Sequence, residues 1–279
     1  MTYFAWPEGH RYGATVSFDF DAESVWIGED PRNAERPGVL SQGAYGPRRG
    51  VPELLRTLER HDIRATFYIC GTDAERHPRS VRSIVEAGHE IAHHGYTHTN
   101  PTELSSAEQR VEIERGLAVL REFGEVTGYR SPSWELTAVT RELLREHGFT
   151  YASNRLDDIF PYLDADGMAE LPVSWILDDA PHFWFANDTW NKTIRSTREV
   201  LDVWLPEIDG IAARGAHVML TMHPMLIGRP SRLDMLDTVL AHLRDTGAWF
   251  GTSQQVAELV RSGALTEDGP ELTEGARVR

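Results

Sequence analysis

The order of apolar and amphipathic segments constrains the fold of this chain most. Short runs of β-branched and aromatic residues alternate with segments whose apolar residues recur at helical spacing. About eight strands are predicted in this way, and most of them are followed by a predicted helix. Such alternation is typical of parallel βαβ units. We therefore predict one barrel-like α/β domain.

The predicted elements span most of the chain. Strands are expected at 14–19, 64–70, 89–93, 127–130, 150–153, 170–175, 216–222 and 248–251. Helices are expected at 51–61, 78–87, 105–125, 137–147, 196–214, 233–244 and 254–261. Residues 22–50 contain five glycines and three prolines, which predicts a long loop. A loop of that length inside a compact domain is more often functional than idle.

Composition limits the class of protein and its partners. The chain has 279 residues, 41% of them hydrophobic, and a net charge of −15, so we predict an ordinary globular protein that binds neither nucleic acid nor an anionic membrane surface. No apolar run approaches the roughly 20 residues of a membrane span, and the first residues lack the apolar centre of a signal peptide. We therefore expect a cytoplasmic protein that does not associate with membranes.

The distribution of residue types along the chain also indicates the number of domains. There is no internal repeat and no shift of composition that would mark a second domain. We predict one domain over residues 1–265, followed by a polar, glycine-containing tail over residues 266–279. Cys70 is the only cysteine and lies in an apolar run, so a buried structural thiol is expected there.

Two histidines form the first candidate for chemistry. His94 and His98 are four residues apart, follow the predicted strand at 89–93 and have Gly95 between them. Imidazole is the commonest metal-ligating side chain, and the two rings can converge on one ion if the backbone turns between them. The pair alone fits a structural role equally well, and it leaves a metal site one ligand short.

Acidic and basic residues follow other predicted strands. Asp19 and Asp21 end the first strand, and because alternate strand residues share a face, both carboxylates can point into one pocket. Arg130, Asp178 and His223 also lie at or after predicted strands. In (β/α) barrels the catalytic residues lie at the carboxyl ends of the strands. These residues are therefore expected to meet at one end of the barrel.

Five segments resemble, in order, the motifs of the polysaccharide deacetylases (the NodB-homology family, carbohydrate esterase family 4). They are residues 17–21 (SFDFD), 94–98 (HGYTH), 129–134 (YRSPSW), 171–175 (LPVSW) and 221–224 (TMHP). The similarity covers roughly residues 10–255 and is nearest to the subgroup of cytoplasmic deacetylase-like, cyclic imidase and allantoinase-like proteins. This resemblance implies a distorted (β/α) barrel with seven or eight strands.

The resemblance also implies roles for the candidate residues. Asp21, His94 and His98 match the metal ligands of the family, and Asp19 matches its catalytic base. Arg130 matches the arginine that holds the base, and His223 matches the catalytic acid.

The chain departs from the family pattern in two places. The usual adjacent aspartates are separated here by Phe20, and the fourth segment has no aspartate of its own. Asp178 or Asp179 must therefore partner His223, and the sequence leaves this choice open.

Two imidazoles and one carboxylate suit a divalent transition ion, with Zn²⁺ favoured and Co²⁺, Fe²⁺ or Mn²⁺ as alternatives. With Asp19 as base and His223 as acid, the expected reaction is metal-assisted hydrolysis of an amide-type carbon–nitrogen bond other than a peptide bond. The substrate would be an N-acetylated short carbohydrate, or a small amide or cyclic imide. Two alternatives are a non-haem Fe(II) oxygenase, which uses the same ligand types, and a barrel that binds a ligand without catalysis.

The remaining histidines and aromatic residues have simpler interpretations. His89 and His93 are expected to be structural residues of the barrel wall. The aromatic segment over residues 181–191 either walls the pocket or packs against another subunit. We favour a subunit contact at the rim of the site, and hence a homo-oligomer.

Overall fold

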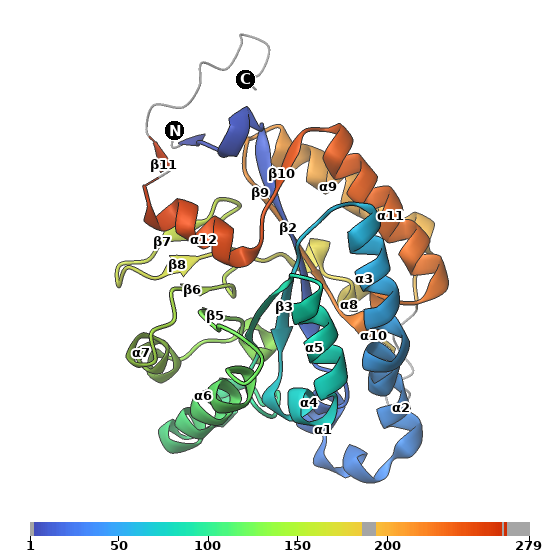
Figure 1. Ribbon diagram of the computed structural model, residues 1–279, viewed down its shortest axis with the longest axis vertical. Helices are drawn as coiled ribbons and strands as arrows, with labels where there is room; N and C mark the ends of the chain where they lie inside the picture. The colour runs from blue at the N-terminus through green and yellow to red at the C-terminus, as the bar shows by residue number, and fades with distance from the viewer. Residues whose placement is uncertain (1–2, 186–193, 264, 267–279) are drawn as a thin grey trace.

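A curled parallel sheet forms the centre of the molecule (Figure 1). A computed structural model describes residues 3–185, 194–263 and 265–266. The strand order is β10-β2-β3-β4-β5-β6-β8-β7, and β9 pairs with β2; every pairing is parallel except that of β7 with β8. The strands are β2 (Tyr12–Phe20), β3 (Thr66–Ile69), β4 (Glu90–His93), β5 (Gly128–Tyr129), β6 (Tyr151–Ala152), β7 (Tyr162–Leu163), β8 (Ala169–Glu170), β9 (His217–Met222) and β10 (Ala248–Phe250). The prediction of a single-domain α/β fold with a distorted (β/α) barrel is confirmed.

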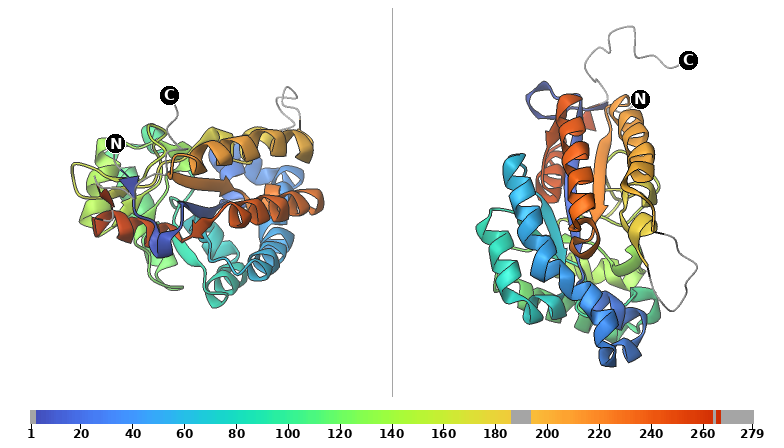
Figure 2. Two further views of the ribbon diagram at one scale, coloured as in Figure 1. Left: turned by 90° about the horizontal axis from the view of Figure 1, so that it is seen from above. Right: turned by 90° about the vertical axis from the view of Figure 1, so that its right-hand side faces the viewer.

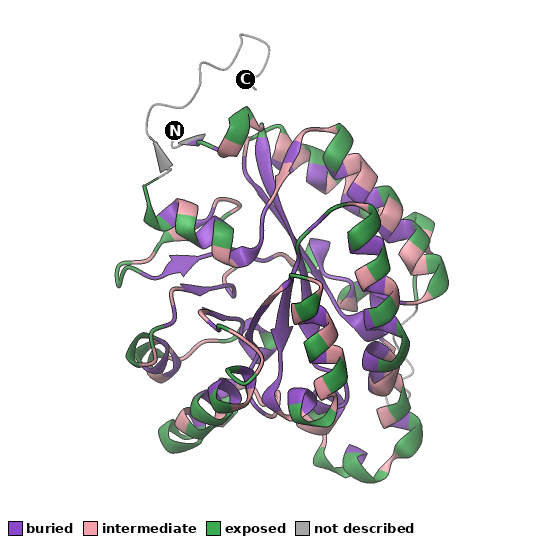
Figure 3. Ribbon diagram, in the orientation of Figure 1, coloured by how far each residue is buried: buried purple, intermediate pink, exposed green. Residues whose placement is uncertain are grey.

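The long strand β2 organises this sheet. It pairs with β9 along one edge, and on the other edge it pairs first with β10 and then with β3. All nine residues of β2 are buried, because helices or further strands cover both of its faces. Figure 3 shows the same pattern, with buried strands in the centre and exposed residues on the outer faces of the helices. The carboxyl end of β2 therefore lies where several strands end together.

The sheet does not close into a complete barrel, since no strand ladder connects β7 or β8 with β9 in the described residues. An isolated bridge between Asp178 and Thr221 and a hydrogen bond from the N–H of His217 to the carbonyl oxygen of Ile159 join the two sides, and a cavity of about 240 Å³ lies between them. The predicted strand at 170–175 is wrong in its extent, since β8 ends at Glu170 and a 3₁₀-helix, η6 (Trp175–Leu177), follows. Pro172 has no N–H for a strand ladder, which explains the early end of the strand.

All seven predicted helices are present and surround the sheet (Figures 1 and 2). Capping boxes at Ser105–Glu108 and Ser196–Glu199 begin two of them, as side-chain oxygens satisfy the first free N–H groups. The helices are α3 (Val51–Arg60), α5 (Pro78–Glu86), α6 (Ser106–Leu120), α7 (Ala138–Glu146), α9 (Thr197–Ala212), α11 (Pro230–Asp245) and α12 (Ser253–Arg261).

Short helices also occur where none was predicted. They are η1 (Pro7–Gly9), α4 (Gly71–Arg76), η4 (Pro101–Glu103), η5 (Pro132–Trp134), α8 (Ala180–Phe183) and α10 (Pro224–Ile227). Most of them follow strands of the sheet.

The predicted loop at residues 22–50 is wrong, because this segment is helical. It forms α1 (Ser24–Glu29), the 3₁₀-helix η2 (Pro31–Glu35), α2 (Pro37–Tyr45) and the π-helical turn η3 (Gly46–Gly50). Its prolines stand in first turns, where a fixed φ suits a helix start. Two glycines provide close packing: a Cβ would lie 2.1 Å from the carbonyl oxygen of Ala22 at Gly43, and 2.1 Å from that of Pro224 at Gly50.

The first and last described residues pair with each other in a small separate sheet. β1 (Tyr3–Phe4) pairs antiparallel with β11 (Leu265–Thr266). Residues 267–279 lie outside the described part, so the boundary of the predicted tail stays a prediction. Within the described ranges, no helix is long and apolar enough to cross a membrane.

One buried histidine of the core leads to a prediction about acid stability. His217 is the first residue of β9, and its side chain is buried. Its Nε2 lies 2.9 Å from Thr15 Oγ1, and the Thr15 hydroxyl donates to the carbonyl oxygen of Gly251. Nε2 therefore carries the proton, and the buried Nδ1 has no partner within the described residues. Burial lowers the pKa of His217 from 6.5 to about 3.

The His217→Gln variant should therefore lose stability less steeply in acid. As the pH falls from 6.5 towards 3, the unfolded chain binds a proton that the folded ring refuses. The contribution of the neutral His217 ring to the free energy of unfolding is thus complete above pH 6.5. Below pH 6.5 it is lost, at up to about 1.4 kcal/mol per pH unit. Urea unfolding at pH 7, 6 and 5 should show that the difference in free energy of unfolding between the variant and the unaltered protein becomes smaller as the pH falls. If the free energies of the two proteins change in parallel with pH, the prediction is wrong.

Candidate active site

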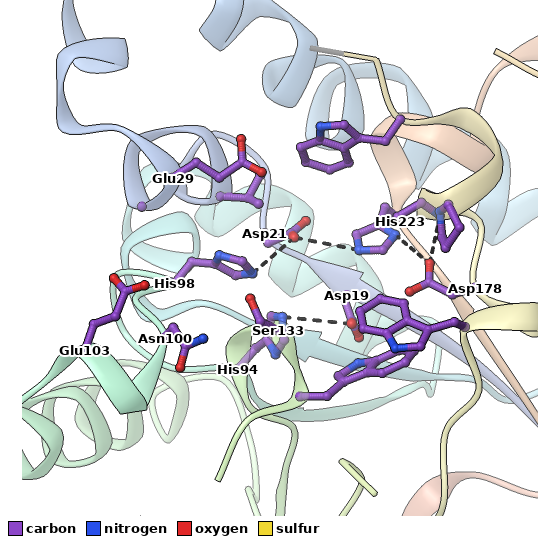
Figure 4. Close-up of a pocket in the computed structure, with 17 residues that line it drawn as sticks. Asp19, Asp21, Glu29, His94, His98, Asn100, Glu103, Ser133, Asp178 and His223 are labelled. Atoms are coloured by element: carbon purple, nitrogen blue, oxygen red, sulfur yellow. Dashed lines mark hydrogen bonds and ion pairs between the residues drawn. The ribbon is translucent and has the colours of Figure 1, made fainter. Parts of the chain in front are cut away.

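A pocket of about 550 Å³ collects six of the seven predicted site residues at the carboxyl ends of the strands (Figure 4). Asp19 and Asp21 reach it from the end of β2, because alternate residues of a strand share a face. The intervening Phe20 packs in the hydrophobic core instead. The other four are His94, His98, Asp178 and His223. Arg130, the seventh, is fully buried and donates a hydrogen bond to Asp19.

Asp21, His94 and His98 form a group that could hold a metal ion. One ligand atom from each lies within 4.8 Å of the other two, and His98 Nε2 is 3.5 Å from Asp21 Oδ2. His94 Nδ1 donates to the carbonyl oxygen of Arg130 at 2.8 Å, which leaves Nε2 unprotonated toward the pocket in the neutral ring. Asp21 Oδ1 is buried and has no hydrogen-bond partner in the described part of the chain.

The electrostatics of these three residues fit a cation. Burial lowers the pKa of His94 and lowers that of His98 well below its usual value, so both rings are neutral ligands at neutral pH. Burial raises the pKa of Asp21 well above its usual value, and the neighbouring carboxylate of Asp19 adds to this effect. The group therefore lacks positive charge, and a divalent cation would supply it.

Asp19 is held in the ionised form beside this group. Burial alone would raise its pKa, but the guanidinium of Arg130, together with His94 and His223, outweighs burial and lowers it. Arg130 Nη1 donates to Asp19 Oδ1 at 2.7 Å, and Asp19 Oδ2 is 3.9 Å from His94 Nε2. One oxygen of Asp19 is therefore bound by Arg130, while the other faces the candidate metal ligands.

The structure distinguishes between the two candidate partners of His223. Asp179 accepts a hydrogen bond of 2.6 Å from His223 Nδ1, and the backbone N–H of His223 also donates to it. Asp178, the other candidate, is 3.8 Å from Nδ1, too far for a hydrogen bond, and lines the pocket instead. Burial alone would lower the pKa of His223, but the carboxylates of Asp21 and Asp179 raise it well above its usual value.

Tryptophan rings form the apolar walls of the pocket. Trp134 and Trp175 stack with their ring centroids 4.0 Å apart, and Trp184 stacks on Trp26 at 4.5 Å. Trp184 belongs to the predicted aromatic segment, so part of that segment does wall the site. Residues 186–191 of the segment lie outside the described residues, and the homo-oligomer stays a prediction. Among the described residues that line the pocket there is no lysine or arginine.

The histidines and the cysteine predicted to be structural lie outside the pocket lining. His93 Nδ1 accepts from the N–H of Gly95, and Nε2 lies 3.2 Å from the carbonyl oxygen of Ile113. His89 Nδ1 accepts from the N–H of Ala65, and the Cys70 thiol is buried and donates to the carbonyl oxygen of His94.

Sequence reasoning missed the side chains that hold Arg130. Ser17 Oγ accepts from Nη1 at 2.9 Å, Ser153 Oγ accepts from Nη2 at 2.9 Å, and the guanidinium lies 3.9 Å from the ring centroid of Tyr68. Ser17 could have been found, since it shares a strand face with Asp19. Ser153 and Tyr68 carry no signal, because serine and tyrosine in a strand are common.

Comparison with known proteins identifies the family. A family model described as polysaccharide deacetylase matches residues 44–152. A Mycobacterium smegmatis protein assigned as a polysaccharide deacetylase has a crystal structure that is 38% identical and superimposes with a TM-score of 0.90; the match covers 98% of this chain and 99% of that one. The chain belongs to the polysaccharide deacetylase family.

Two further proteins are similar to this chain over most of its length. A peptidoglycan deacetylase of Helicobacter pylori is 26% identical over 86% of this chain and 93% of its own length. The crystal structure of an allantoinase is 22% identical with a TM-score of 0.80, covers 92% of both chains, and so shows a shared fold alone. Membership of this family supports a hydrolase of the carbon–nitrogen type with a small-molecule or carbohydrate substrate, whereas the predicted subgroup stays a prediction.

Proposed function

We propose that this protein removes N-acetyl groups from a short carbohydrate by metal-assisted hydrolysis. One observation carries the proposal: Asp19, held by Arg130, and His223, held by Asp179, both lie within 3.9 Å of the group Asp21, His94 and His98. Amide hydrolysis needs a base for the attacking water and an acid for the leaving nitrogen, and this arrangement provides both beside one candidate ion site.

Asp21, His94 and His98 would hold the metal. One carboxylate and two neutral imidazoles are a donor set typical of catalytic Zn²⁺, and three protein ligands leave room for substrate. A divalent cation at this place would polarise the amide carbonyl and make a nearby water more acidic. The buried, unpartnered Oδ1 of Asp21 is consistent with such an ion.

Asp19 is proposed as the general base. Its Oδ2 faces the ligand group, so it can accept the proton of a water that attacks the carbonyl carbon. Arg130 binds Oδ1 and keeps the carboxyl ionised, so the base is ready at neutral pH. The guanidinium is fully buried, and its other hydrogen bonds, to Ser17 and Ser153, fix the direction of Asp19.

His223 is proposed as the general acid. Its Nδ1–H donates to Asp179, and its Nε2 lies 3.9 Å from Asp21 Oδ2 on the pocket side. Since nearby carboxylates raise its pKa, the ring is protonated at neutral pH and can donate the Nε2 proton to the leaving amine. Base and acid thus both lie beside the proposed ion site (Figure 4).

The lining of the pocket favours a carbohydrate. The stacked pair Trp134 and Trp175 offers flat apolar surface, and Trp175 is 48% exposed, so a sugar ring can pack its apolar face there. The absence of lysine and arginine from the described lining disfavours anionic substrates. The 26% identity to a peptidoglycan deacetylase over most of the chain also favours an N-acetylated sugar over a cyclic imide.

Metal removal tests the proposal. Purified protein incubated with N-acetylglucosamine oligomers should release acetate, and a chelator should lower the rate by about 100-fold or more, because carbonyl polarisation contributes several kcal/mol to catalysis. Adding Zn²⁺ back should restore the rate. Acetate release and free amine are measured together, so that amide hydrolysis is separated from ester hydrolysis.

Parallel assays address the competing functions. Succinimide and hydantoin are incubated under the same conditions, and chelator-sensitive turnover of these imides alone would replace the carbohydrate as substrate. Oxygen consumption with Fe(II) and a 2-oxo acid tests the oxygenase alternative, for which a site flanked by Asp19 and His223 has no evident use. No chelator-sensitive hydrolysis of either substrate class would overturn the proposed function.

A further inference from the structure

A carboxylate from helix α6 binds the backbone of the turn that carries His98. Glu112 Oε2 accepts from the N–H of Tyr96 at 2.7 Å and from the N–H of Thr97 at 2.8 Å. Glu112 Oε1 accepts from the hydroxyl of Thr97 at 2.7 Å. Three hydrogen bonds thus connect one side chain to two consecutive residues between His94 and His98.

The conformation of the turn explains why such support is needed. His98 has a φ of +63°, in the left-handed region, which non-glycine residues adopt infrequently and which costs free energy. The turn also leaves N–H groups without the partners that a helix or strand would provide. An ionised carboxylate forms stronger hydrogen bonds to N–H groups than a neutral acceptor does, so Glu112 is well suited to hold the turn.

A second contact fixes the same turn from another direction. The ring of Tyr96 lies under the guanidinium of Arg115, 4.0 Å from its centroid, and its hydroxyl donates to Glu75 and accepts from Arg115. Arg115 and Glu112 both belong to α6. The position of His98 relative to His94 therefore depends on one face of this helix.

We propose that Glu112 is a positioning residue for the metal site, which it serves by fixing the turn so that His98 Nε2 faces Asp21 and His94. The inference rests on the proposed function, because it assumes that these three residues bind a metal. Glu112 does not itself line the pocket, so it acts through the backbone of the turn. Groups that orient metal ligands from outside the coordination shell typically change metal affinity by about 10–100-fold.

The direct test is the affinity of Glu112→Ala for Zn²⁺. Metal-free protein competes with a chromophoric chelator for Zn²⁺ at fixed pH, and the variant should bind about 10–100-fold more weakly than the unaltered protein. Glu112→Gln keeps the length of the side chain and one carbonyl acceptor, so it should regain part of the lost affinity. Alanine is a good helix former, so α6 itself should persist.

Matched variants separate positioning from general destabilisation. Glu114→Ala removes an exposed carboxylate from the same helix, whose partners are Arg110 and His147, and should leave the affinity unchanged. Thr97→Val removes the hydroxyl bond to Glu112, together with the contact of that hydroxyl with Thr99 Oγ1, but keeps both backbone N–H bonds to Glu112, so it should weaken binding less than Glu112→Ala does. Thermal unfolding of each metal-free variant shows which of them fold.

The outcomes bear on the two proposals separately. If the unaltered protein binds no Zn²⁺, the proposed function fails. If it binds Zn²⁺ and folded Glu112→Ala binds equally well, Glu112 has no positioning role. If Glu112→Ala does not fold, Thr97→Val and Glu112→Gln provide the test. Weaker Zn²⁺ binding by these two variants supports the inference, and unchanged affinity in both overturns it.

Discussion

Asp19→Asn should lower the turnover of an N-acetylated carbohydrate by about 10²–10⁴-fold, the usual contribution of a general base. The amide of asparagine cannot accept the proton of the attacking water at neutral pH. Zn²⁺ affinity should change little, because Asp19 Oδ2 lies 3.9 Å from His94 Nε2 and Asp21 provides the carboxylate of the ligand group. The predicted loss is therefore in the rate of hydrolysis and not in metal content.

The stability of Asp19→Asn needs to be measured beside its activity. Arg130 is fully buried and would keep a neutral oxygen in place of a charged one, so we expect a loss of about 1.5–3 kcal/mol in the free energy of unfolding. Urea unfolding at 25 °C measures this loss, and assays run well below the melting temperature exclude unfolding as the cause of inactivity. Turnover equal to that of the unaltered protein would remove Asp19 as the base.

The barrel and the acidic end of its first strand could be predicted because both follow from local periodicity. Alternation of strands and helices predicts parallel units, and the period of two along a strand places Asp19 and Asp21 on one face with Phe20 on the other. These rules involve neighbours in sequence only. The convergence of the two aspartates with His94 follows once the strands are known to end at one edge.

The segment at residues 22–50 could not be predicted, because proline and glycine have two opposite meanings. Both residue types are typical of loops, yet here the prolines begin helical turns and the glycines allow close contact with distant backbone. At Gly50 that contact is with Pro224, 174 residues further along the chain, and no local pattern reveals it.

The choice between Asp178 and Asp179 has a similar cause. Beyond Glu170 the chain leaves the sheet at Pro172 and forms a 3₁₀-helix, so the period of two no longer indicates which aspartate faces His223. Glu112 is equally hidden, since it is an ordinary acidic residue in the middle of a helix. Its three bonds to the turn depend on how α6 packs against β4.

His223→Gln should reduce the hydrolysis of N-acetylated sugars by about 10²–10⁴-fold. A sugar amine is a poor leaving group unless it is protonated, and glutamine has no acidic proton to supply. The loss should therefore depend on the leaving group. Acetyl esters of good leaving groups, such as 4-nitrophenyl acetate, need no proton and should be affected far less. Comparing kcat for the two substrate types in both proteins measures this dependence.

The two aspartates next to His223 provide the matched pair of variants for this prediction. Asp179→Asn removes the charge that receives the 2.6 Å hydrogen bond from Nδ1, so the ring loses both its orientation and part of the electrostatic support for its protonated form. Asp178→Asn changes a carboxyl 3.8 Å from the same nitrogen and should cost distinctly less for amide substrates. Equal losses for amides and activated esters in His223→Gln would contradict a role as general acid. A larger loss in Asp178→Asn than in Asp179→Asn would instead make Asp178 the functional partner, because distance and hydrogen bonding would then have failed to rank the two carboxylates.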